Sequence, residues 1–523
     1  MNPQHDQHHI PAWFADAEPQ VQHASLPQDL QADVCIVGAG IAGLSCAYEL
    51  MKAGKRVIVL DDGPIGGGQT GRTTAHLSNE CDDRYEHMES VHGEEGSRII
   101  AESHTRAIDR IEEIATAEGI ECDFRRLDGY LFLGPDDTAA SLQKEHEAAT
   151  RAGLVGVELL ASFTLGGKVL QPCLRFPRQG QFHPLKYLQG LAQAVERGGG
   201  KIFTGVHVKK IEGGTPAKVT TSQDKQVTAG AVIVATNSPI NDMLVIHTKQ
   251  APYMSYVVAG RVPKGAVPPG LYWDTQDPYH YVRLQPLPTA SALKADNYEL
   301  LIVGGEDHKT GQADDYQRRY DALRKWATQH FPGFDAVDFQ WSGQVLEPVD
   351  GVAFIGRNPG DQSNVYIVTG DSGQGMTHGA MSGLIITDLI LGRENPWAKL
   401  YDPARKTLSS AGEFAKENLN VAMQYAAWVT PGDAESIDAV PRGEGAVVRH
   451  GLEKVAVYRD DHGHVHQMTA TCPHLGCVVQ WNGDEKTWDC PCHGSRFDCQ
   501  GSVIIGPANT DLKPIGAEPQ KQS

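Results

Sequence analysis

One stretch of the sequence, residues 33–61, constrains the fold more than any other. A short apolar run at 34–37 is typical of a buried parallel strand, and three glycines follow it before an apolar-periodic segment that is typical of a helix. A second apolar run at 57–60 ends at Asp61. This succession predicts a complete βαβ unit closed by an acid, with a simple glycine-rich turn as the alternative interpretation.

The glycines and the acid of this unit have separate physical roles. Gly38 permits the tight turn, Gly40 lets the backbone approach a pyrophosphate, and Gly43 allows the helix to pack closely on the strand. Free N–H groups at the helix N-terminus would bind phosphate, and Asp61 would accept a hydrogen bond from a ribose hydroxyl. The stretch therefore predicts a dinucleotide-binding site.

Length and charge limit the remaining possibilities. The chain has 523 residues, which predicts two or more domains, and its net charge of −19 argues against nucleic acid or an anionic membrane surface as the main partner. No apolar run approaches the ~20 residues that span a bilayer. Residues 1–32 are expected to form a polar tail without a secretion signal, so we expect a cytoplasmic protein. Its three early histidines are expected to be solvated, with metal binding as the alternative: His5, His8 and His9.

Two further segments are predicted to contact the dinucleotide. A loop rich in glycine and threonine follows Asp61, and its small residues and hydroxyls suit close approach to a cofactor. A second glycine cluster at 369–380 stands between an apolar strand at 365–368 and an apolar helix, whose N-terminus would place partial positive charge against a flavin ring. The candidate contacts in the two segments are Gln69, Arg72, Thr73, Gly370, Gly375, Met376 and Thr377.

The sequence between these segments is expected to form a substrate-facing part. Residues 93–118 and 137–153 have helical patterns, 126–134 alternates like a strand, and 231–235 is an apolar strand that would extend the first sheet. Within a β-patterned region at 253–304, three polar residues alternate and therefore share one face of a strand, which is either a pocket wall or a polar sheet surface. These candidate catalytic residues are Tyr279, Tyr281 and Arg283.

Three parts of the sequence have recognisable motifs: the early GAGIAG with its acid, the returning strand around Val208, and the DG and TGDSGQGMTHG motifs between residues 350 and 379. Together they resemble the FAD-dependent oxidoreductases of the D-amino acid oxidase and glycine oxidase family. The resemblance covers about 33–392. It implies an α/β fold with a Rossmann-like FAD-binding domain, assembled within 33–400 from pieces near 33–95, 200–245 and 345–400, and an inserted mixed-sheet substrate domain. Val208 would contact the adenine side.

Two positions bear on the substrate and the flavin linkage. Family members that act on amino acids often carry an arginine just before the DG pair, where this chain has Val345. An α-amino carboxylate is therefore a less secure substrate, although Arg283 could supply the bidentate partner. His76 lies in a Thr-x-His pattern similar to one that some amine dehydrogenases of the family link to flavin, and an ordinary polar loop histidine is the alternative.

Five of the ten cysteines crowd between residues 472 and 499, which indicates a metal site in a cytosolic protein. The sequences CPHLGC and CPCHGS offer two thiolates and two imidazoles from two loops. A tetrahedral zinc ion could use the same ligands, but it would leave Cys477 and Cys492 unexplained. Both boxes together resemble the Rieske [2Fe–2S] motif.

The Rieske resemblance implies a small all-β domain at 432–523 with four iron ligands, which are Cys472, His474, Cys490 and His493. Cys477 and Cys492 match members whose two loops are joined by a disulfide. Residues 506–508 match the proline loop that covers the cluster. The serine that donates to a cluster sulfur is present as Ser495, but Phe497 replaces the second donor, a tyrosine, which implies a lower reduction potential.

Residues 401–431 are expected to connect the two parts through a helix at 409–428, which either docks the C-terminal domain or only spaces it. The whole chain resembles bacterial FAD-dependent oxidoreductases with a C-terminal Rieske domain. The resemblance implies oxidation of a small amine or amino-acid-like substrate by hydride transfer to FAD, and relay of single electrons to an external acceptor such as a soluble carrier. The alternatives are an oxidase that uses dioxygen and has a structural cluster, and a redox sensor.

Overall fold

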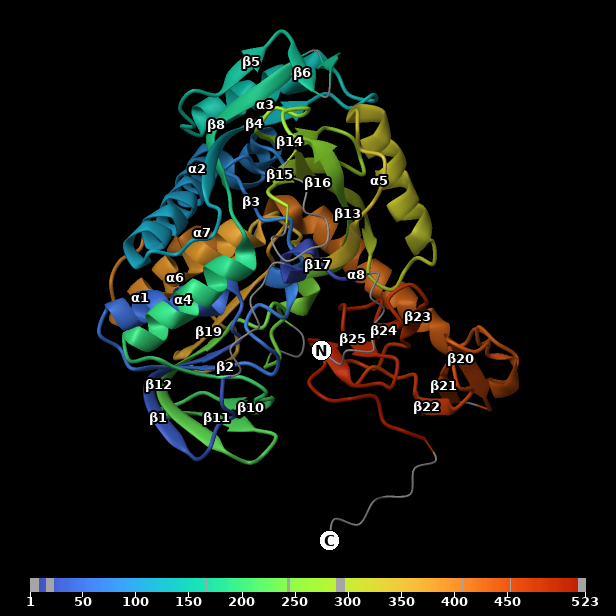
Figure 1. The fold of residues 1–523 in the computed structure, drawn as a ribbon. Helices are drawn as coiled ribbons and strands as arrows, with labels where there is room; N and C mark the ends of the chain where they lie inside the picture. Colours follow the sequence, from blue (N-terminus) through green and yellow to red (C-terminus); the bar gives the residue numbers. More distant parts are fainter. Residues whose placement is uncertain are drawn as a thin grey trace.

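The computed structural model describes residues 9–15, 23–165, 167–170, 172–241, 245–287, 297–406, 408–451 and 453–515. Figure 1 shows a sheet with its helices, a larger sheet beyond it, and the C-terminal strands to one side of both. The central strands of the first sheet pair in parallel, and the strands at its margins, such as β10, β11 and β18, pair antiparallel. Within the described residues, no helix is long and apolar enough to cross a membrane.

The predicted βαβ unit is present and forms the centre of the first sheet. Strand β1 pairs in parallel with β2 on one side and with β12 on the other. Strand β19 continues the sheet beside β12, so distant parts of the chain meet in one layer. The elements of this sheet are β1 (Leu30–Val37), β2 (Val57–Leu60), β9 (Lys201–Phe203), β10 (Val208–Glu212), β11 (Ala217–Thr221), β12 (Gln226–Val234), β18 (Phe354–Arg357) and β19 (Val365–Thr369).

Glycine sets the close fit between this sheet and its first helix. A Cβ atom at Gly43 would lie 1.9 Å from the Gly38 carbonyl oxygen, and Gly38 itself has φ +109°. Both positions therefore exclude a larger side chain. The helices of this part are α1 (Ile41–Lys52), α2 (Tyr85–Glu118), α4 (Pro184–Arg197), α6 (Gly375–Leu391) and the short α7 (Ala398–Tyr401). Helix α2 starts earlier than predicted and is kinked at Gly93, the residue where the sequence pattern placed its start.

The second sheet is mixed, as the sequence predicted for the inserted part. Most of its strands pair antiparallel, and β14 pairs with β4 in parallel. Its strands are β3 (His76–Leu77), β4 (Arg125–Phe132), β5 (Glu158–Leu160), β8 (Cys173–Gln181), β13 (Gln250–Pro263), β14 (Leu271–Asp274), β15 (His280–Gln285), β16 (Tyr298–Lys309) and β17 (Phe339–Pro348). The remaining elements here are α3 (Ala139–Arg151), α5 (Tyr316–His330) and a small hairpin of β6 (Phe163–Leu165) and β7 (Lys168–Leu170).

The C-terminal part contains two small antiparallel sheets (Figure 1). Their apolar core packs around the cysteine boxes and includes Trp488 and Phe497, both fully buried. The strands are β20 (Glu444–His450), β21 (Glu453–Arg459), β22 (Val465–Thr469), β23 (Gln480–Asn482), β24 (Thr487–Asp489), β25 (Arg496–Asp498) and β26 (Val503–Ile505).

The connecting helix α8 (Ala411–Gln424) contacts both parts of the chain. Glu417 accepts a 2.5 Å ion-paired contact from Lys309 of β16, and Val421 packs on the C-terminal core. In the 3-10 turn that follows, Tyr425–Trp428, the Tyr425 hydroxyl donates to the Leu475 carbonyl and the Trp428 indole donates to the Gly476 carbonyl. The helix therefore docks the C-terminal part rather than only spacing it.

Candidate cofactor sites

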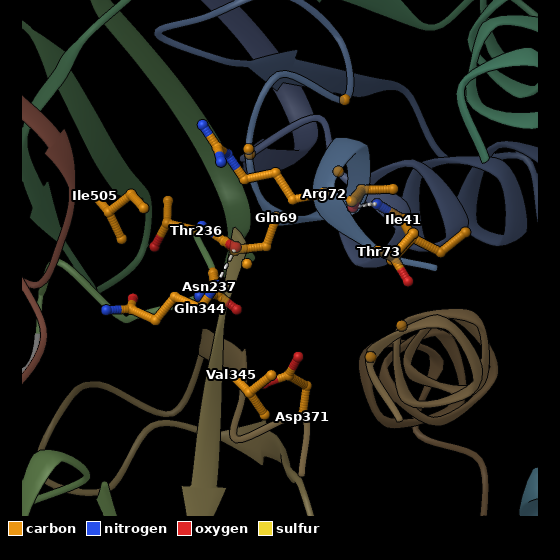
Figure 2. Close-up of a pocket in the computed structure, with 18 of the residues that line it drawn as sticks. Ile41, Gln69, Arg72, Thr73, Thr236, Asn237, Gln344, Val345, Asp371 and Ile505 are labelled. Atoms are coloured by element: carbon orange, nitrogen blue, oxygen red, sulfur yellow. Dashed lines mark hydrogen bonds between the residues drawn. The ribbon is translucent and has the colours of Figure 1, made fainter. Parts of the chain in front are cut away.

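A cavity of about 980 Å³ lies at the carboxyl edge of the first sheet and extends to the second sheet and the C-terminal part. Figure 2 shows side chains from separate segments converging there, among them Gln69, Asn237 and Gln344, with Ile505 of the C-terminal part beside them. Twelve of the residues named from the sequence line this cavity: Gly38, Gly40, Asp61, Gln69, Arg72, Thr73, Val208, Tyr279, Tyr281, Gly375, Met376 and Thr377.

The first βαβ unit provides a phosphate and ribose end. The Ile41 N–H at the start of α1 donates to the Thr70 hydroxyl over 3.1 Å, and the space beside Gly40 is open except for that hydroxyl. Asp61 accepts from the Ala39 N–H at 2.5 Å and from the Gly63 N–H at 2.8 Å. Burial, followed by the nearby Asp62, raises the pKa of Asp61 to about 7. A helix N-terminus, a bare glycine and a terminal acid therefore fit a dinucleotide.

The second glycine cluster faces the same cavity from α6. Gly375, Met376 and Thr377 form the first turn of that helix and line the cavity, where its partial positive charge points. Gly370 does not line the cavity: it has φ +73°, and a Cβ atom there would lie 2.8 Å from the Pro348 ring. Gly43 is likewise absent from the lining. These two glycines shape the backbone and do not contact the cavity.

Aromatic side chains form the end of the cavity beneath the second sheet. The ring centroids of Tyr279 and Tyr281 lie 5.4 Å apart. The Tyr279 hydroxyl donates to Asp82 over 3.2 Å, and the Tyr281 hydroxyl pairs with the Ser255 hydroxyl at 2.7 Å. Burial, followed by the charge of neighbouring Asp83, raises the pKa of Asp82 to about 8. This end therefore holds a carboxyl group that can bind or release a proton near neutral pH.

The expectation that Arg283 faces the substrate needs correction. Its side chain is fully buried, and Arg283 is not among the cavity-lining residues. The guanidinium donates to the carbonyls of Thr74, Ala75 and Phe182 and lies under the Trp13 ring. Alternation along β15 correctly put Arg283 on the face of Tyr281, but the loop after Thr73 and the N-terminal segment cover that end of the strand.

His76 and Val345 both line the cavity. The two ring nitrogens of His76 are hydrogen-bonded, Nδ1 with the Thr74 hydroxyl at 3.0 Å and Nε2 with the Val282 carbonyl at 3.2 Å. Burial, followed by the positive charge of Arg283, lowers the pKa of His76 to about 3, so its ring is neutral. Val345 presents an apolar wall where amino-acid oxidases often carry arginine.

Several cavity residues were missed in the sequence. Thr236 and Asn237 follow β12 after Ala235, and the end of a parallel strand beside the glycine turn is a signal that could have identified them. Trp273, Asp82 and Gln344 come from the second sheet and its loops. No local pattern distinguishes them, because only the stacking of the two sheets brings them to the cavity.

The two cysteine boxes converge in the C-terminal core. A disulfide joins Cys477 to Cys492, with their Cα atoms 6.4 Å apart. The sulfurs of Cys477, Cys490 and Cys492 gather within 4.8 Å, but the disulfide leaves only Cys490 of these three as a thiolate ligand. The four remaining box residues, the predicted iron ligands, are all buried: Cys472, His474, Cys490 and His493.

The chemistry of these four residues fits a [2Fe–2S] cluster. Hydrogen bonding from the Cys490 thiol, opposed by burial, lowers the pKa of the Cys472 thiol, and Ser495 adds a further hydrogen bond. The rings of His474 and His493 stand 5.0 Å apart at 90°. Burial, followed by the neighbouring histidines, lowers the pKa of His493 to about 3, and its buried Nδ1 has no hydrogen-bond partner among the described residues. Neutral imidazole and a thiol that deprotonates readily are the forms that bind iron.

A buried ionic network connects the two sites. Glu485 of the C-terminal part pairs with Arg72 at 3.4 Å and contacts Arg496, which also pairs with Asp489 at 2.9 Å. Although burial alone would raise the pKa of Glu485, the charges of Arg496 and Arg72 lower it to about 2. Arg72 thus lines the cavity, but its positive charge is paired with Glu485 of the C-terminal part.

Two sequence families match the chain. Residues 33–389 match the family of FAD dependent oxidoreductases (DAO), and residues 430–515 match the Rieske [2Fe-2S] domain. The putative Rieske 2Fe-2S iron-sulfur protein YhfW of Bacillus subtilis (strain 168) is 31% identical over 502 residues, covering 94% of each chain. Gamma-glutamylputrescine oxidoreductase of Escherichia coli (strain K12) is 28% identical over 395 residues, or 73% of this chain and 88% of that protein.

Solved structures share the fold. Glycine oxidase from Geobacillus kaustophilus superimposes with a TM-score of 0.58 at 16% identity, covering 72% of this chain and 99% of that chain. L-amino acid deaminase from Proteus myxofaciens gives a TM-score of 0.57 at 14% identity, covering 75% and 97%. The predicted α/β architecture with an inserted mixed sheet is therefore confirmed.

Proposed function

Since the chain belongs to the FAD-dependent oxidoreductase (DAO) family and ends in a Rieske [2Fe–2S] domain, as its motifs predicted, we propose that it oxidises the C–N bond of a small amine and passes the electrons singly to an external acceptor. FAD, when bound, accepts the hydride, and the cluster carries one electron at a time. The observation that carries the amine assignment is the hydrogen bond between Asp82 and Tyr279 at the aromatic end of the cavity.

The acidic side chains around the cavity favour a basic substrate over a carboxylate. Glu80, Asp82 and Asp371 line it. The two arginines that line it, Arg72 and Arg496, are both held by Glu485. A substrate carboxylate would need a bidentate cation, and Val345 supplies none. A related protein named for the oxidation of gamma-glutamylputrescine, an amine, adds support.

Asp82 is the residue that we assign to proton transfer. An ammonium group must lose a proton before its carbon can give up a hydride, and a carboxylate within hydrogen-bond reach can accept that proton. Tyr279 donates to Asp82 and orients it, while the neighbouring Tyr281 is held by Ser255. The aromatic rings of both tyrosines and Trp273 would exclude water and pack on the alkyl part of the amine.

The electron route is supported by the extent of the cavity, which is lined by residues of the C-terminal part such as Ile505 and Gly506. Gln344 spans the junction, because its N–H donates to the Gln69 side chain at 2.7 Å and its side chain donates to the Gly494 carbonyl at 2.8 Å. Gln69 belongs to the cofactor loop and Gly494 follows a cluster histidine. Gln344 therefore connects the cofactor loop to the second cysteine box through two hydrogen bonds.

Anaerobic mixing with a panel of amines tests the proposal. Bleaching of the flavin by an amine, at a kcat/KM that rises as the pH passes about 8, is the expected result, because Asp82 must be deprotonated to act as the base. Asp82→Asn should abolish that limb of the pH profile and lower kcat/KM at least tenfold. Asp128→Asn, in a residue of β4 that does not line the cavity, should change neither. No bleaching by any amine would contradict the substrate class.

The acceptor is tested with the same enzyme. Ferricyanide should reoxidise the reduced wild type quickly, while Cys472→Ala, without a cluster, should lose that rate. Equal reoxidation by dioxygen in both proteins would favour the oxidase alternative.

A further inference from the structure

One histidine of the flavoprotein body lies against both histidines of the cluster boxes. His247 belongs to the 3-10 turn His247–Lys249 between β12 and β13 and is buried. Its ring centroid lies 4.8 Å from that of His474 at 77°, and 5.9 Å from that of His493 at 66°. The three imidazoles thus form an edge-to-face cluster, an arrangement that aromatic rings favour.

The surrounding contacts hold this ring in place. His247 Nε2 and the Pro239 carbonyl are 3.2 Å apart. The Asn418 amide of α8 donates to the Thr248 carbonyl over 2.9 Å, which pins the turn from the other side. Neither of these two contacts comes from the cysteine boxes, so the body and the connector both help to hold His247.

The same segment of chain also reaches the FAD cavity. Thr236, Asn237 and Ile240 line the cavity, and six positions separate Ile240 from His247, of which 242–244 lie outside the described residues. A Cβ atom on Gly506 of the proline loop would lie 3.4 Å from Ile240. One stretch of the body therefore runs from the cofactor wall to the cluster histidines.

We propose that His247 is a positioning residue for the cluster: its ring orients both imidazole ligands and makes the histidine side of the cluster the side that receives electrons from the flavin of the same chain. Groups packed around metal ligands commonly fix ligand orientation and tune the metal. The inference rests on the proposed function for its electron source. Nothing in it depends on the substrate being an amine.

The electron balance is simple. Each transfer takes one electron from the two-electron-reduced flavin and converts one ferric ion of the cluster to ferrous. Two transfers and the release of one proton restore oxidised FAD, provided that the external one-electron acceptor reoxidises the cluster after each transfer.

The test compares His247→Ala and His247→Phe in the full-length holoprotein, with His146→Ala as the matched control. His146 is a partly buried histidine in α3 whose Nε2 is 3.1 Å from the Val157 carbonyl, distant from both sites. Iron and sulfide contents are measured first, then the EPR g values and midpoint potential by chemical titration. Finally, the flavin is reduced by light in the presence of EDTA, and the rate of cluster reduction is recorded, so that no substrate is required.

His247→Ala should shift the g values and slow flavin-to-cluster transfer at least tenfold. His247→Phe should keep most of the rate, because the ring packing is retained, and His146→Ala should match the wild type. If His247→Ala loses its cluster, retention of the cluster in His247→Phe would support the same positioning role. Wild-type g values, potential and rate in His247→Ala would overturn the proposal, and so would equal losses in the alanine and phenylalanine variants. Failure of every amine in the substrate panel would leave these light-driven results intact and would remove only the proposed substrate class.

Discussion

The FAD cavity and the cluster site differ in how their residues are brought together. The four predicted cluster ligands lie between residues 472 and 493 in two short loops that a disulfide joins. The cavity takes its lining from segments as far apart as His9 and Asp511, and it needs both large sheets to be stacked correctly. The cluster site is thus a local structure, whereas the cavity is a product of the whole fold. Each should therefore survive damage to the other, except where the buried ionic network joins them.

The sharpest test of this independence removes a cluster ligand. Cys472→Ala or His493→Ala should abolish the cluster completely, because each supplies one bond to an iron. FAD should be retained at one per chain, since most of the residues that line its cavity belong to the body. Iron, acid-labile sulfide and flavin are measured together, with Cys173→Ala as a control for loss of a buried cysteine in β8. Loss of FAD along with the cluster would show that the two regions are not independent.

The next largest effect should come from the buried ionic network that links the FAD cavity to the cluster site. Glu485→Gln leaves Arg72 and Arg496 without their shared carboxylate in a site where Glu485 and Arg496 side chains are only 7% and 4% exposed. Breaking a buried pair of this kind costs ~3–5 kcal/mol. Thermal unfolding should therefore show a less stable C-terminal part. Glu95→Gln, which breaks an exposed pair with Arg98, should leave the transition unchanged.

The same variant predicts a pH dependence with a definite sign. The pKa of Glu485 is lowered from 4.5 to about 2 in the folded protein, so its stabilising contribution is fully present above pH 4.5 and is lost as the pH falls toward 2. The free-energy difference between wild type and Glu485→Gln should shrink across that window. A difference that stayed constant down to pH 2 would mean that the carboxylate is not paired as described.

Gly43→Ala tests the body alone and should have a smaller effect on stability. The new Cβ atom would lie 1.9 Å from the Gly38 carbonyl oxygen, so α1 must move away from β1. Overpacking of this kind costs ~1–3 kcal/mol. We expect a lower melting temperature and weaker FAD retention with a normal cluster. Gly412→Ala, where the added Cβ meets nothing within 4 Å, is the control. Full FAD occupancy with unchanged melting would contradict the assigned role of Gly43.

A finer change should affect only the cluster. Ser495 hydrogen-bonds with Cys472 and accepts from the Ala508 N–H at 2.9 Å, so one hydroxyl already acts on the sulfur environment. Phe497→Tyr should add a second donor and raise the midpoint potential, provided that the hydroxyl reaches sulfur. EPR-monitored titration measures the shift, with Ser495→Ala expected to lower the potential. An unchanged or lowered midpoint in an intact Phe497→Tyr cluster would mean that the second donor is misplaced.

The smallest expected effect concerns His76. Both of its ring nitrogens are hydrogen-bonded, and we expect acid precipitation to release all of the flavin into the supernatant. Flavin that stays in the protein pellet of the wild type, and is released from His76→Ala, would establish the covalent link instead.

Local patterns predicted the parts of the molecule whose geometry depends on neighbours in sequence. The βαβ unit follows from an apolar run, three glycines and Asp61, because a tight turn and a helix N-terminus are properties of a few consecutive residues. The cluster boxes follow from ligand spacing within two loops. Tyr279 and Tyr281 could be assigned to one face because strand alternation is local, but the same rule put Arg283 in a cavity that it does not reach.

The sequence by itself determined the two cofactor motifs, the fold class and the order of the parts, since glycine conformation, helix polarity and ligand type act over short distances. Only the tertiary structure decided what surrounds them. Contacts between residues far apart in the chain bury Arg283 under Trp13 and bring Asp82 and Gln344 to the cavity. Similar contacts place His247 against two cluster histidines. Such contacts are set by how sheets stack and how the C-terminal part docks, and no periodicity in the sequence records them.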